Sequence, residues 1–175
     1  IRRDFFASKA PVDIGDIFYA DLGKNYKPEC SYGHPVLVME IIGNMIFVVP
    51  VSSSPDKIKE AYHPIDNKDG NTNLRKVTDR EGFKSDCTLL LSNARTISGG
   101  RLLEKKGNIF NSDKGKELFE EIKNTMLLGY FPKQKISMDK LNAENEKLTK
   151  ENEGLKDEIE SLKKQILELQ SKEKN

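Results

Sequence analysis

Three short polar segments carry the side chains best suited to acid–base chemistry and to holding an anion. Glu29 and His34 offer a carboxylate and an imidazole, and an imidazole exchanges its proton close to working pH. Hydroxyl groups at residues 52–54 and the guanidinium of Arg95 can donate hydrogen bonds to a developing negative charge. The candidate site residues are Glu29, Ser31, His34, Ser52, Ser53, Ser54, Asn93 and Arg95.

Motifs for several other chemistries are missing from the sequence. It contains no Gly-rich phosphate loop ending in Lys-Ser/Thr, no HExxH, no CxxC and no GxSxG. The two histidines, His34 and His63, lie 29 positions apart, which argues against a metal site. We therefore expect neither a metal ion nor a cofactor.

Each candidate also has a structural interpretation. A histidine before a proline at the start of a strand is often an exposed loop residue, and three serines before Pro55 are typical of a turn. Arg95 could brace the fold through an internal ion pair, and Glu29 could act as a base or only orient His34. These alternatives stay open at this point.

The candidates lie near the ends of predicted strands. Apolar and β-branched runs predict strands at residues 16–22, 35–42, 45–51, 88–91 and 94–97. Gly43-Asn44 is typical of a hairpin turn, and residues 64–87 favour an irregular connection. Apolar side chains at helical spacing predict an amphipathic helix over 112–130. Short strands followed by a helix favour a mainly β fold with a C-terminal α part, a small SH3-like barrel.

The last forty residues follow a different pattern. Residues 136–175 contain no proline and no aromatic residue, and leucine recurs there at every seventh position. With leucine at d and isoleucine or asparagine at a, the pattern predicts a parallel two-stranded coiled coil whose asparagines fix the register. The alternative is a single amphipathic helix packed on the body. The dimerisation residues would be Leu141, Asn145, Leu148, Asn152, Leu155, Ile159, Leu162, Ile166 and Leu169. We expect two domains, a barrel over 1–135 and a coiled-coil tail over 136–175.

Composition limits the class of protein. The chain has 175 residues, of which 36% are hydrophobic and 33% charged, and its net charge is +1. A strongly basic coat for nucleic acid is therefore excluded, although a local basic site is not. The longest apolar runs are too short to cross a bilayer. Cys30 and Cys87 are expected to be reduced thiols in a cytoplasmic protein.

Four segments, in order, resemble one protein family. The chain between about residues 14 and 130 is similar to the MazF/PemK toxins, endoribonucleases of bacterial toxin–antitoxin pairs, which share a small barrel with CcdB-like proteins. The similar segments are residues 15–22, residues 29–41 from Glu29 through Pro35 to the next strand, residues 48–53, and residues 93–102 with Asn93-Ala94-Arg95-Thr96.

The resemblance implies a reaction and a set of partners. It implies metal-independent cleavage of single-stranded RNA by attack of a ribose 2′-hydroxyl, with Ser52 at the scissile phosphate and Ser31, Ser53, Ser54, Asn93 and Arg95 as RNA-binding candidates. His34 stands where most members have arginine, and it could replace that residue as acid or base. The resemblance also implies a cognate antitoxin and a homodimer.

Two interpretations from other classes remain. One is a non-catalytic binding module on the same barrel, such as a topoisomerase poison, because a fold does not determine function. The other is an interaction protein whose coiled coil is the working part. Cleavage of RNA in the absence of metal would distinguish the toxin from the binding module. If a chain without residues 136–175 still cleaved RNA, the interaction protein would be excluded.

Overall fold

The structure is a computed structural model that describes the backbone of residues 11–173 and the side chains of residues 11–166. The predicted coiled-coil residue Leu169 therefore lies outside the described side chains. The chain divides into two compact units, Ile1–Met126 and Leu127–Asn175. In the described part of the chain, no helix combines the length and the apolarity needed to cross a membrane.

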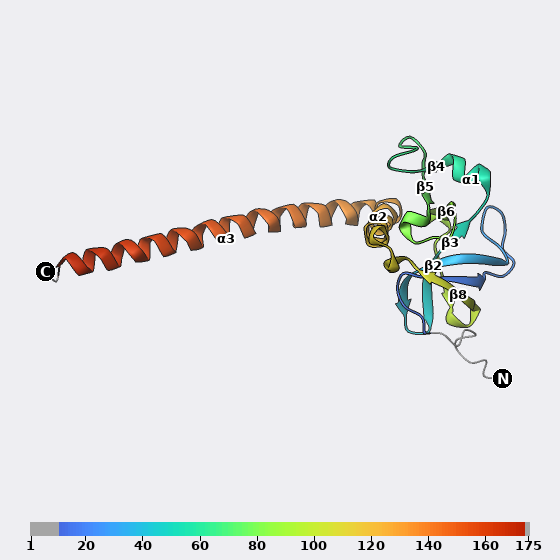
Figure 1. The fold of residues 1–175 in the computed structure, drawn as a ribbon, viewed down its shortest axis with the longest axis horizontal. Coiled ribbons are helices and arrows are strands. Elements are labelled where there is room, and N and C mark those ends of the chain that lie inside the picture. Colours follow the sequence, from blue (N-terminus) through green and yellow to red (C-terminus); the bar gives the residue numbers. More distant parts are fainter. Residues whose placement is uncertain (1–10, 174–175) are drawn as a thin grey trace. The chain divides into compact units, whose positions relative to one another are not determined.

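Eight strands of the described chain form one sheet (Figure 1). Their order is β4-β5-β6-β3-β2-β1-β8, and β7 also pairs with β3. The path does not close on itself, so the mainly β fold with a C-terminal α part is confirmed as an open sheet rather than a closed barrel. The strands are β1 (Asp16–Asp21), β2 (Gly33–Ile42), β3 (Met45–Ser52), β4 (Ala61–Tyr62), β5 (Asn71–Val77), β6 (Cys87–Leu90), β7 (Arg95–Ser98) and β8 (Leu102–Asn108).

Three α-helices and four short 3-10 helices are present among the described residues. They are α1 (Pro55–Glu60), α2 (Asp113–Tyr130), α3 (Pro132–Glu173), η1 (Asp79–Glu81), η2 (Leu91–Asn93), η3 (Gly99–Arg101) and η4 (Ile109–Asn111). In the second unit, α3 is one uninterrupted helix (Figure 1).

The central strands are built from residues that bury both faces. In β2, Val36 and Val38 belong to one buried cluster, while Leu37 and Met39 belong to the other. Successive side chains of a strand point to opposite faces, so a continuous apolar run is what a strand buried on both sides requires. The cluster containing Leu37 and Met39 also includes the apolar face of α2, up to Met126.

The sequence prediction differs from the structure in several places. Residues 64–87, expected to be an irregular connection, contain strand β5 and helix η1. Strands β4 and β8, helix α1 and the short helices η2 to η4 were not predicted. The first three residues of β5 are exposed. Strand β8 is mostly polar, and among the described strands it pairs only with β1. Neither strand shows in its sequence the alternation of apolar and polar residues on which strand prediction depends.

Two ion pairs are anchored on buried charges. Asp16 is fully buried, and its carboxylate accepts hydrogen bonds from Asn108 and the Asp13 N–H and pairs with Lys105 Nζ at 2.8 Å. The buried guanidinium of Arg75 makes a bidentate pair with Glu121, in which Nε and Nη2 donate over 2.7 and 2.9 Å. The second pair joins β5 to α2.

We expect the buried thiol of Cys87 to destabilise the protein at alkaline pH. Burial raises the pKa of Cys87 to about 12 from its usual 9.0, and the carboxylates of Asp86 and Glu81 add to the effect. Between these two values the unfolded chain loses the thiol proton and the folded chain keeps it, so the free energy of unfolding falls as pH rises. One such group contributes at most about 1.4 kcal/mol per pH unit.

The measurement is urea unfolding at pH 8, 9.5 and 10.5 for the wild type and for Cys87→Ala. The variant should lose stability less steeply above pH 9. Equal slopes for the two proteins would show that Cys87 has no part in the alkaline loss.

Candidate active site

The candidate residues gather where three neighbouring strands have their ends. Antiparallel pairing of β2 with β1 and with β3 places the start of β2 beside the ends of both strands, with Ala20 opposite His34 and Val36 opposite Pro50. The loop between β1 and β2 carries Glu29 and Ser31. These pairings bring the first two polar segments to one edge of the sheet.

His34 is held by the end of β3. The side chain is half-buried, and its Nδ1 lies 3.3 Å from the carbonyl oxygen of Val51, the residue before Ser52. A carbonyl oxygen can only accept a hydrogen bond, so Nδ1 must be the donor in this contact. In the neutral ring Nε2 then carries the lone pair and can take a proton. This geometry suits His34 to act as a general base.

The loop of residues 22–33 is tied to η2 and β7. The N–H of Cys30 donates to the side-chain oxygen of Asn93 over 2.8 Å. Glu29 Oε2 lies 3.5 Å from Nη1 of Arg95, and Nε of Arg95 donates to the carbonyl of Asn93. The structure therefore brings Glu29, Asn93 and Arg95 together. Among the described residues, no ion pair joins Glu29 to His34.

Asn25 organises this loop from within. Its side-chain amide donates to the carbonyls of Leu22, Gly23 and Cys30, at 3.1, 3.4 and 2.7 Å. The hydroxyl of Ser31 donates to the Asn25 carbonyl and accepts from the Asn25 N–H. Ser31 thus shapes the loop with the same hydroxyl that the sequence assigned to RNA binding.

The serine segment forms the junction between β3 and α1. Ser52 is the last residue of β3 and is buried, and its hydroxyl accepts a hydrogen bond from the Ser54 N–H at 3.3 Å. Ser53 is exposed, and Ser54 precedes the first residue of α1. On the neighbouring strand, Thr88 lies opposite Ser52. The three serines therefore differ in accessibility, and Ser53 is the most exposed.

Two cations lie close to Cys30. Burial raises the pKa of the Cys30 thiol, and the positive charges of Lys57 and Arg95 partly offset this effect. Lys57 lies on α1, which follows the serine segment directly. The sequence indicates Lys57 as a possible contact to an RNA phosphate, but Lys57 is not among the candidate site residues, because scattered lysines are usually only solvated. A basic residue shortly after the serine segment was the available signal.

The arrangement therefore offers a proton acceptor at His34, a hydroxyl at Ser52 and cations at Arg95 and Lys57. Within the part of the chain that the structure describes, no three His, Cys, Asp or Glu side chains are grouped so that they could hold a metal ion.

A comparison with models of protein families gives a match. The model of the family described as "PemK-like, MazF-like toxin of type II toxin-antitoxin system" matches residues 13–126. This range begins shortly before β1, ends within α2, and includes every candidate residue of the three polar segments. Helix α3 lies outside it. No curated protein matches the chain.

Proposed function

The chain belongs to the family of PemK-like, MazF-like toxins of type II toxin–antitoxin systems, and on that premise we propose that it cleaves single-stranded RNA without a metal ion. Toxins of this family are generally endoribonucleases. The observation that carries the proposal for this chain is the contact between His34 Nδ1 and the carbonyl of Val51. Because Nδ1 donates in this contact, Nε2 of the neutral ring can accept a proton, and the ring lies beside the end of β3 at Ser52.

The proposed reaction is a transesterification. A ribose 2′-hydroxyl gives its proton to a base and attacks the adjacent phosphorus, while the bond from phosphorus to the leaving 5′-oxygen breaks and that oxygen takes a proton. The base and the acid can be one imidazole that accepts the first proton and donates it in the second transfer. We assign this role to His34, with the carboxylate of Glu29 as the second candidate.

Charge on the phosphorane needs donors that are already in place. We assign this stabilisation to the Ser52 hydroxyl and to the cations of Arg95 and Lys57. Arg95 is oriented by its contacts with Glu29 and the Asn93 carbonyl, so its guanidinium has little freedom to reorganise. Ser53 and Ser54 are proposed to contact the RNA backbone. Ser31 and Asn93 are proposed to act through the shape of the loop that they hold.

Single-stranded RNA fits this site better than a duplex, because unpaired nucleotides can rotate the 2′-hydroxyl into line with the phosphate. We propose that the natural substrate is messenger RNA, that the protein acts in the cytoplasm, and that a cognate antitoxin covers the same site. The proposal of an RNA substrate and of an antitoxin is based on membership of the family.

The test is cleavage of a single-stranded RNA in the presence of EDTA. The products should carry a 2′,3′-cyclic phosphate, or the 3′-phosphate formed from it, which mass spectrometry identifies. The matched control is the same oligonucleotide with one 2′-deoxyribose at the cut site, which should stay intact because the attacking hydroxyl is missing. A requirement for Mg²⁺, 5′-phosphate products or cleavage of the deoxy control would each contradict the proposal.

A further inference from the structure

Helix α3 carries a stripe of exposed apolar side chains. Leu141, Leu148, Leu155 and Leu162 follow one another at intervals of seven residues, and each is about half exposed, between 48% and 60%. Exposed large apolar side chains in a continuous row mark an interaction surface. A partner helix with apolar residues at the same seven-residue interval would cover this stripe.

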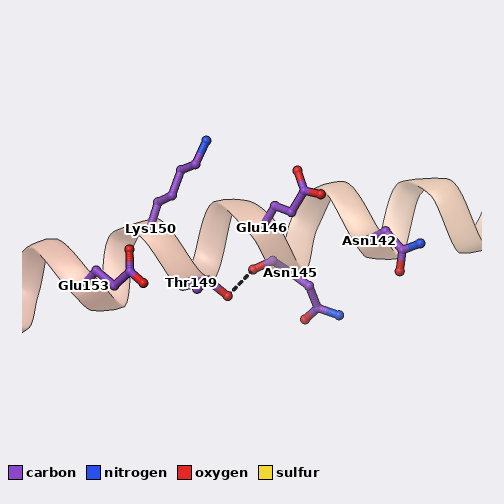
Figure 2. A pocket seen from close by; sticks show the side chains of 6 residues that line it. All are labelled: Asn142, Asn145, Glu146, Thr149, Lys150 and Glu153. Carbon is purple, nitrogen blue, oxygen red and sulfur yellow. Dashed lines mark hydrogen bonds between the residues drawn. The ribbon is translucent and has the colours of Figure 1, made fainter. Parts of the chain in front are cut away.

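The residues beside these leucines indicate what kind of partner fits. In the heptad with leucine at d, the a positions hold Asn145 and Asn152 and then Ile159 and Ile166. Isoleucine at a with leucine at d favours two parallel strands, and asparagine at a specifies the register. Figure 2 shows Asn145 on the opposite side of the helix from Lys150, as the a and f positions require.

The charges that flank the stripe complement a second copy of the same helix. The g positions hold Glu151 and Glu158, and the e positions hold Lys156 and Lys163. In a parallel pair each g residue faces the e′ residue five positions later, so Glu151 meets Lys156 and Glu158 meets Lys163 of the other copy. An antiparallel pair would instead place glutamate against glutamate and lysine against lysine.

We propose that α3 docks on α3 of a second copy of this chain as a parallel, in-register, two-stranded coiled coil. The C-terminal half supplies most of the stability, because isoleucine occupies its a positions and both Glu–Lys pairs lie at or beyond Glu151. The N-terminal half supplies the register through Asn145 and Asn152. The family match ends before this helix, so the proposal does not depend on the reaction at the active site.

A parallel arrangement has a consequence for the catalytic units. Each unit precedes its own α3 in the chain, so the coiled coil joins both units to the same end of one rod. Tethering turns any contact between the two units into an intramolecular event at a high effective concentration. The pair of catalytic units would then persist at concentrations at which untethered units separate.

The proposal is tested by disulfide cross-linking of the full chain. Leu141→Cys and Ile166→Cys are made as separate variants and oxidised mildly, with the native Cys30 and Cys87 buried in both. In a parallel, in-register pair each new cysteine faces its own copy, so each variant alone should form a covalent dimer. In an antiparallel pair that overlaps over residues 138–169, only a mixture of the two variants would cross-link, as a 141–166 species.

Three further variants separate the coiled coil from contacts made elsewhere. Adding Leu155→Glu should reduce the cross-linked fraction at both positions by at least about tenfold, because each dimer would bury two carboxylates at d. The matched control, Ala143→Glu, adds the same charge at the outward f position and should leave cross-linking unchanged. Lys150→Cys, also at f, should give no covalent dimer.

Each alternative result would overturn the proposal. A 141–166 product would show an antiparallel pair, and a trimer in sedimentation equilibrium would show a different assembly. Absence of cross-links at both positions, or equal yields with and without Leu155→Glu, would show that α3 does not pair with itself.

Discussion

Replacing His34 by alanine should slow RNA cleavage by about 10²–10⁴-fold, the usual weight of one acid–base group. The loss follows from removing Nε2, the proton acceptor that the Val51 carbonyl leaves available. RNA should still bind with nearly the same affinity, because most contacts to nucleic acid are made to the backbone by other residues. Single-turnover cleavage and fluorescence anisotropy measure the two effects separately.

Two variants control this experiment. His34→Arg should restore part of the rate and should flatten its dependence on pH between about 5 and 8, the interval in which an imidazole ordinarily changes charge and a guanidinium does not. His63→Ala removes the other histidine, whose Nδ1 accepts from the Asp66 N–H, and should leave the rate per folded molecule unchanged. A normal rate for His34→Ala would assign the chemistry to Ser52 and Arg95 or would favour a binding module.

Replacing Glu121 by alanine should lower the free energy of unfolding by about 3 kcal/mol. The change leaves the guanidinium of Arg75 buried without its bidentate partner, and breaking a buried pair costs about 3–5 kcal/mol. The lower end applies because a third of the Glu121 side chain is exposed, whereas only 5% of Arg75 is. Urea unfolding measures the difference.

The neighbouring glutamate provides the matched control. Glu120 lies on the same helix and pairs with Lys123 over 3.0 Å, with more than half of each side chain exposed. An exposed pair of this kind contributes about 0–1 kcal/mol, so Glu120→Ala should have a small effect. Equal losses for the two variants would show that the Arg75–Glu121 pair contributes no more than a surface pair.

The strands that are buried on both faces could be predicted from the sequence, because burial requires apolar residues there. The runs in β2 and β3 are continuously apolar because both of their faces are covered, and Gly43 adopts the positive φ of 59° that the turn between them needs. Strand β5 begins with Asn-Thr-Asn, so its residue types do not predict a strand. It forms a strand through backbone pairing with β4 and β6. Backbone pairing at such positions depends on neighbours that are distant in sequence.

The candidate site was predictable at the level of segments. The sequence placed Glu29, Asn93 and Arg95 in one site, and the structure brings these three together. The sequence did not show that the Ser31 hydroxyl forms hydrogen bonds with the Asn25 backbone. Hydrogen bonds within a loop follow from the path of its backbone. The catalytic and RNA-binding roles of these residues stay predictions.

In the described part of the chain, the main path of the open sheet ends at β4 and at β8, and each of these strands discourages other chains from adding to it. At one end β4 is only two residues long, too short to template a further strand. At the other end β8 carries Glu104, Lys105 and Lys106 in succession, and charged side chains on an outer strand oppose pairing with a neighbouring molecule. Both features would limit edge-to-edge aggregation of the folded protein.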